Sequence, residues 1–142
     1  METTIKTVPY KGWKNNLQLA NGDAELTITL DVGPRVISYR LTNGPNVFKE
    51  WEDQLGKSGE SDWIIRGGHR LWRGPEDEKL TYVPDNTPLA YEQLGPGSVR
   101  LMQPVEEITG ISASRQACNS SLILGKASHA TWPQLVGNSS IA

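Results

Sequence analysis

Alternation of apolar and polar positions dominates the first half of the chain. In AELTITLDVG (residues 24–33), every second residue from Leu26 to Val32 is apolar, and polar residues stand between them. A period of two with β-branched residues predicts a strand with one buried face. The Asn21-Gly22 pair before it favours a tight turn. After a break at Gly33-Pro34, RVISYRL (35–41) predicts a second strand.

Further strands follow. The sequence TNGPN (42–46) predicts a turn into VFKEW (47–51), which completes an antiparallel meander. SVRLMQPVEE (98–107) predicts another strand, with Val99 and Leu101 on one face. KLTYVPDNTPLAY (79–91) contains two prolines, which suit loops or edge strands. No run of helical period occurs in residues 1–110, so we expect an all-β antiparallel fold.

Composition changes abruptly near residue 110. All 16 Asp and Glu residues precede residue 111, and residues 111–142 are rich in serine and alanine. The one apolar cluster there is Leu122 to Leu124, which offers little to bury. We therefore expect a β domain over residues 1–110 and a poorly ordered tail over 111–142.

Charge, hydropathy and cysteine content give no sign of several classes of protein. A charged content of 21% and a net charge of -2 give no electrostatic argument for binding nucleic acid or an anionic membrane. No apolar run is long enough to span a bilayer, and the first residues lack the apolar core of a signal peptide. The single cysteine, Cys118, cannot form an intramolecular disulfide. The expected location is the cytoplasm.

The segment IRGGHRLWRGPED (65–77) concentrates candidate chemistry. Gly67-Gly68 allows a close backbone approach that a side chain would prevent. His69 follows, and a histidine titrates near neutrality, so it can act as an acid or a base. If the segment is extended, Arg70 and Trp72 share one face and His69 points to the other.

Each of these residues has an alternative structural interpretation, and for His69 it is an ordinary surface or hydrogen-bonded histidine. Arg70 is placed to clamp a carboxylate or vicinal hydroxyls, whereas Arg73 is expected to pair with neighbouring carboxylates in solvent. Trp72 could stack on the flat face of a sugar or belong to the core. Glu76, after a proline, could accept from sugar hydroxyls, act as a base or only increase solubility.

The segment TYVPDN (81–86) adds three hydrogen-bonding residues on a loop, Tyr82, Asp85 and Asn86. The alternative for Asp85 and Asn86 is ordinary turn chemistry. No Lys-Ser/Thr pair follows Gly67-Gly68, so a phosphate loop is excluded. The spacing of His69, Glu76 and Asp85 does not predict a metal site, and no cofactor is expected. Cys118 has no histidine nearby to activate it.

These segments, in this order, resemble a bacterial domain family of unknown function that is related to aldose 1-epimerases (galactose mutarotases). The likeness covers about residues 10–111 and rests on NG…GPRVISYR, GGHRLW-x-x-PE, TY-x-x-DN and QPVEEITGI. It implies an antiparallel β-sandwich with a sugar-binding cleft on the concave face of one sheet.

The resemblance also implies site roles. In mutarotases a histidine protonates the ring oxygen and a glutamate removes the anomeric proton. Here His69 would be the donor and, with Arg70, would face the cleft; Glu76 is the second catalytic candidate. The implied substrate-binding residues are Arg70, Trp72, Tyr82, Asp85 and Asn86.

The likeness stops near Gly110, although members of this superfamily are longer and carry the mutarotase base in their C-terminal half. One hypothesis is that this chain is a truncated or frame-shifted product with only the N-terminal part of the fold. Such a chain would expose a sheet edge prone to self-association. The expected function is carbohydrate binding, with sugar epimerisation by an aldose 1-epimerase-like isomerase in intact relatives. The alternatives are a non-catalytic carbohydrate-binding β-module and an inactive truncated product.

Overall fold

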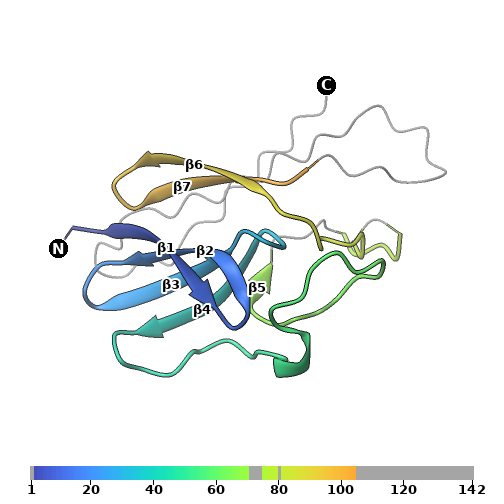
Figure 1. Ribbon diagram of the computed structural model, residues 1–142, viewed down its shortest axis with the longest axis horizontal. Helices are drawn as coiled ribbons and strands as arrows, with labels where there is room; N and C mark the ends of the chain where they lie inside the picture. Colours follow the sequence, from blue (N-terminus) through green and yellow to red (C-terminus); the bar gives the residue numbers. More distant parts are fainter. Residues whose placement is uncertain (1, 71–74, 80, 105–142) are drawn as a thin grey trace.

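The computed structural model describes residues 2–70, 75–79 and 81–104, and all of its strand pairs are antiparallel (Figure 1). A five-stranded sheet has the order β1-β2-β3-β4-β5, and a separate hairpin pairs β6 with β7. The strands are β1 (Thr4–Tyr10), β2 (Trp13–Ala20), β3 (Ala24–Thr29), β4 (Arg35–Leu41), β5 (His69–Arg70), β6 (Ala90–Gly95) and β7 (Ser98–Met102). The one short 3-10 turn among these residues is η1 (Glu52–Gln54).

The expected antiparallel β class is therefore confirmed for this part of the chain, which contains no α-helix. None of the described residues forms a helix long and apolar enough to cross a membrane. The tail predicted over residues 111–142 lies outside the described residues.

One core lies between the sheet and the hairpin. Leu17 of β2, Ile28 of β3 and Val36 of β4 pack with Val99 and Leu101 of β7, and all five are buried. The β6-β7 hairpin thus forms a second layer over one face of the sheet (Figure 1). Burying each aliphatic side chain of this size contributes about 1.5–3 kcal/mol before entropy is counted.

A second core covers the opposite face of the sheet. Ile37 alternates with Val36 along β4 and packs with Trp13, Val32 and Leu55. The indole nitrogen of Trp13 donates to the carbonyl of Lys57 at 2.8 Å. The loop after Trp51 therefore folds back onto the sheet and covers the end of β4 that begins at Arg35.

The two cores explain a departure from the alternation in β3. The sequence predicts one apolar and one polar face, yet Thr27 and Thr29 are buried as well. A bulge interrupts the β3-β4 register between Thr27 and Ile28. The Thr29 hydroxyl donates to the Val32 carbonyl at 2.7 Å, which satisfies it away from water. Side chains on both faces of the C-terminal end of β3 are therefore buried, whereas the sequence predicted burial on one face only.

The prediction of a strand over 47–51 is wrong. Only an isolated antiparallel bridge joins Glu50 to Gly67, and the Gly68 N–H donates to the Lys49 carbonyl at 2.9 Å. This segment is held by a glycine-containing loop, which gives it contacts but no continuous ladder. Lys49 and Trp51 of this segment line the pocket described next.

Candidate ligand pocket

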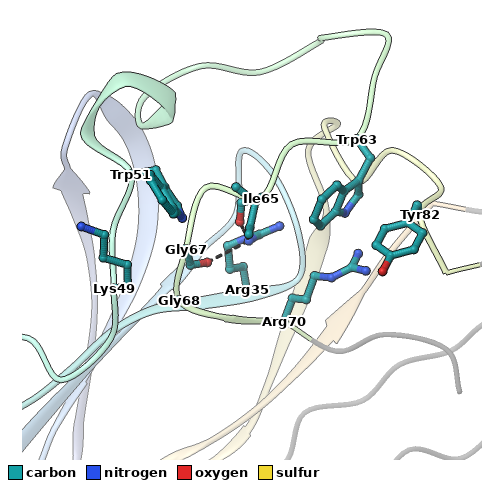
Figure 2. Close-up of a pocket in the computed structure, with 9 residues that line it drawn as sticks. All are labelled: Arg35, Lys49, Trp51, Trp63, Ile65, Gly67, Gly68, Arg70 and Tyr82. Atoms are coloured by element: carbon teal, nitrogen blue, oxygen red, sulfur yellow. Dashed lines mark hydrogen bonds between the residues drawn. The ribbon is translucent and has the colours of Figure 1, made fainter. Parts of the chain in front are cut away.

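A pocket of about 470 Å³ opens where the ends of β4 and β5 meet the loops over residues 49–68 and 81–86. Figure 2 shows aromatic and cationic side chains from these elements around it. The aromatic and cationic lining residues are Trp51, Trp63, Tyr82, Arg35, Lys49 and Arg70.

Gly67 and Gly68 line the pocket as well, and backbone crowding explains why both are glycine. Their φ angles are +101° and +70°. A Cβ on Gly67 would lie 2.9 Å from the Cα of Glu50, and one on Gly68 would lie 2.9 Å from the Cα of Ile37. The close approach expected from the sequence is confirmed, and its partner is the protein's own backbone.

Arg35 holds this loop from beneath. Its side chain is 2% exposed and donates to the carbonyls of Ile65 and, at 2.8 Å, Gly67. Its other terminal nitrogen lies 3.1 Å from Asp85, whose side chain is 8% exposed. Burial lowers the pKa of Arg35, while the Asp85 carboxylate opposes this shift by stabilising the cation.

A second buried arginine fixes the same loop. Arg66 has a left-handed backbone (φ +51°), and its side chain is fully buried. It donates to the Gln54 carbonyl at 2.8 Å, the Asn86 amide oxygen at 2.9 Å and Glu60 at 2.6 Å. Burial opposes ionisation of Glu60, but hydrogen bonds led by the one from Arg66 lower its pKa below the usual value.

Asn86 completes this network. Its amide donates to the carbonyl of Asp62 at 2.6 Å and to that of Glu60 at 3.0 Å. The loop over residues 60–67 is thus tied down at many points by buried polar groups. Such a loop needs little reordering when a ligand binds.

One end of the pocket is formed by Lys49 and Trp51. The ammonium of Lys49 lies 5.1 Å from the centroid of the Trp51 ring, within the range of a cation–π contact. Trp51 is 43% exposed, which is unusual for so large an apolar side chain. An exposed ring of this kind offers an apolar surface to a ligand.

Arg70, Trp63 and Tyr82 form the other end. The Arg70 guanidinium lies 4.8 Å from the Trp63 centroid and donates to the Thr81 carbonyl at 2.8 Å. The rings of Trp63 and Tyr82 meet edge to face, 5.0 Å apart at 74°. The Tyr82 hydroxyl donates to Glu76, and this hydrogen bond raises the pKa of Tyr82.

Only some of the site residues proposed from the sequence line the pocket. Arg70 and Tyr82 line the pocket, and Glu76 reaches it through the Tyr82 hydroxyl. His69 does not line it: the imidazole is exposed and stacks near Phe48, with ring centroids 6.4 Å apart. In an extended segment neighbouring side chains point to opposite faces, and His69 and Arg70 are neighbours in β5.

Asp85 and Asn86 are buried and bound to the two arginines, so they shape the pocket without lining it. Trp72 lies outside the described residues. Lys49, Trp51 and Trp63 were not identified from the sequence. The available signal was the pair of tryptophans at the two ends of the polar segment 52–62, which the fold brings to one pocket.

Comparisons with known proteins add no evidence about the fold or the pocket. No family model, curated protein or solved structure matches this chain. Within the described ranges, no three His, Cys, Asp or Glu side chains lie close enough together to hold a metal ion.

Proposed function

We propose that this chain forms part of a mutarotase-like β-sandwich that binds a carbohydrate in the pocket between Trp51 and Trp63. The motif resemblance and the antiparallel sheet with a hairpin packed on one face support this fold. The observation that carries the function is that two tryptophans line one pocket, Trp51 at 43% exposure and the half-buried Trp63.

Aromatic rings suit sugars because the C–H groups of a pyranose form an apolar face that packs on a ring. A volume of about 470 Å³ lies within the range of small-molecule sites. The Tyr82 hydroxyl and the guanidinium of Arg70 supply polar groups to orient the sugar hydroxyls. The buried Arg35–Asp85 pair keeps the loop in place before the ligand arrives.

Binding without catalysis is the function that the described lining favours. Among the described lining residues there is no histidine and no carboxylate, so no acid and base pair faces the pocket directly. The carbohydrate-binding module is therefore the first candidate.

Sugar 1-epimerisation is the second candidate, favoured by the contact between Tyr82 and Glu76. The phenol oxygen could accept the anomeric hydroxyl proton while the phenol proton passes to Glu76. As the C1–O5 bond breaks, its electron pair goes to the ring oxygen, which takes a proton from a solvent water, and the hydroxide so formed takes back the proton held by Glu76. The open aldehyde recloses on either face by the reverse of these steps. Polarimetry of fresh α-galactose tests this: a rate above buffer that falls in Tyr82→Phe supports it, and a buffer rate contradicts it.

Tryptophan fluorescence titrations test the binding proposal. The panel is galactose, glucose and their uronic acids. We expect saturable quenching by at least one sugar and a loss of about tenfold in affinity, on the order of 1.4 kcal/mol, in Trp51→Ala. Tyr91→Ala is the matched control, because Tyr91 is equally exposed, at 43%, but lies on the β6-β7 hairpin. Equal losses in both variants, or no binding by any sugar, would contradict the proposal.

A further inference from the structure

The charges around the pocket are strongly one-sided. Three cations line it, Arg35, Lys49 and Arg70, and no Asp or Glu does so among the described residues. Asp85 compensates Arg35 from the buried side. Glu76 accepts from the Tyr82 hydroxyl at the Arg70 end of the pocket. The positive side is therefore the end formed by Lys49 and Trp51, and a neutral sugar would not require such a charge.

Among these cations, Lys49 gives the strongest evidence for an anionic ligand. The two acidic residues that follow it in the sequence have other partners: Glu50 accepts from the Tyr10 hydroxyl at 2.7 Å, and Glu52 pairs with Lys11 at 2.9 Å. No carboxylate of the described residues forms an ion pair with Lys49. Its ammonium remains beside the exposed Trp51 ring, 5.1 Å from the centroid.

This pairing has a chemical consequence. A pyranose stacked against Trp51 would bring its ring substituents next to the Lys49 ammonium. A carboxylate on that ring would form a charge-assisted hydrogen bond there, which is about twice as strong as a bond between neutral groups. A hydroxymethyl group at the same place would gain much less.

The other end of the pocket also holds a cation, Arg70, beside an aromatic ring. Its guanidinium faces Trp63 and is oriented by the Thr81 carbonyl at 2.8 Å. Figure 2 shows Lys49 and Arg70 on opposite sides of the pocket, with Ile65 and Arg35 between them. Both walls thus combine a cation with an aromatic ring.

From these observations we propose that the ligand is an acidic sugar, a uronic acid unit whose carboxylate is bound by Lys49. This inference rests on the proposed function, because it specifies the substrate class of the same pocket.

Isothermal titration with matched ligands tests it. Galacturonate and galactose differ at C6 alone, acetate carries the charge without the ring, and galactose 6-phosphate carries a different anion. We expect galacturonate to bind at least tenfold more tightly than galactose and acetate, and this preference to shrink as salt rises. A preference for galactose 6-phosphate over galacturonate would overturn the assignment of a carboxylate.

Two lysine variants locate the effect. Lys49→Met should reduce the preference for galacturonate over galactose to about onefold, with an unchanged circular dichroism melting curve. Lys57→Met is the matched control and should keep the preference, because Lys57 lies outside the pocket and its ammonium donates to the Asp53 carbonyl at 2.6 Å. Loss of preference in both variants would overturn the role of Lys49.

The failures are distinguishable. Equal affinity for galactose and galacturonate overturns the acidic-sugar inference and leaves carbohydrate binding intact. No binding of any sugar overturns the proposed function itself. Equal affinity for acetate and galacturonate shows a general anion site and overturns the sugar-acid assignment.

Discussion

Replacing Asp85 by alanine should destabilise the fold severely. Its carboxylate lies 3.1 Å from the Arg35 guanidinium, and the two side chains are 8% and 2% exposed. The substitution leaves the arginine charge buried without its counter-ion, which typically costs about 3–5 kcal/mol. A domain of this size has a total stability of about 5–15 kcal/mol, so the loss is a large part of the whole.

Urea denaturation followed by circular dichroism measures this loss. Glu92→Ala is the matched control: its pair with Arg100 is also short, at 3.0 Å, but the side chains are 54% and 45% exposed. That variant should lose less than about 1 kcal/mol. If Asp85→Ala lost no more stability than the control, burial would not be what makes the Arg35–Asp85 pair important for the fold. Retained stability with lost sugar affinity would return Asp85 to the role of a sugar-binding residue.

Three other substitutions test separate parts of the structure by the same denaturation assay. Gly68→Ala should lower the free energy of unfolding by about 2 kcal/mol, since the new Cβ would lie 2.9 Å from a backbone carbon of β4. Gly59→Ala should lower it less, because nothing lies within 4 Å of a Cβ there. Equal losses would contradict the crowding at Gly68. Glu60 has a lower pKa in the folded protein than in the unfolded chain, so its carboxylate stabilises the fold at a pH above about 4.5, and this contribution is lost as the pH falls further. Glu60→Gln should therefore make the free energy of unfolding fall less steeply below about pH 4.5. An unchanged slope would count against this. Leu101→Ala should cost about 2–5 kcal/mol and Leu94→Ala, at 40% exposure, under about 0.5 kcal/mol; similar small losses would mean that the hairpin does not pack on the sheet.

Part of the fold could be predicted from the alternation of residue types. The strand predicted over 35–41 matches β4, and Val99 and Leu101 of β7 share a buried face as expected. β1 and β2 were not predicted. In β2 (WKNNLQLA) the polar residue Asn16 is buried, so it interrupts the alternation of apolar and polar residues. Its amide donates to the Val8 carbonyl at 3.0 Å. Tertiary hydrogen bonding of this kind leaves no periodic signal.

The site was predicted only in part, because it combines segments far apart in the sequence. Arg70 of GGHRLW and Tyr82 of TYVPDN both line the pocket, and their roles in substrate binding stay predictions. The family resemblance implied that Asp85 would bind substrate, and residue type alone suggested turn chemistry. In the structure its carboxylate is bound to Arg35, 50 residues earlier. That partner becomes visible only when β4 and the later loop are brought together.

The tryptophan indole N–H signals in a two-dimensional NMR titration with galacturonate report directly on whether this ligand binds in the pocket. Trp51 and Trp63 line the pocket, whereas Trp13 is 2% exposed and its N–H is bound to the Lys57 carbonyl. With signals assigned by substitution, we expect those of Trp51 and Trp63 to shift saturably and that of Trp13 to stay in place. Stationary signals from both pocket tryptophans at high galacturonate concentration would show that this sugar acid does not bind in the pocket.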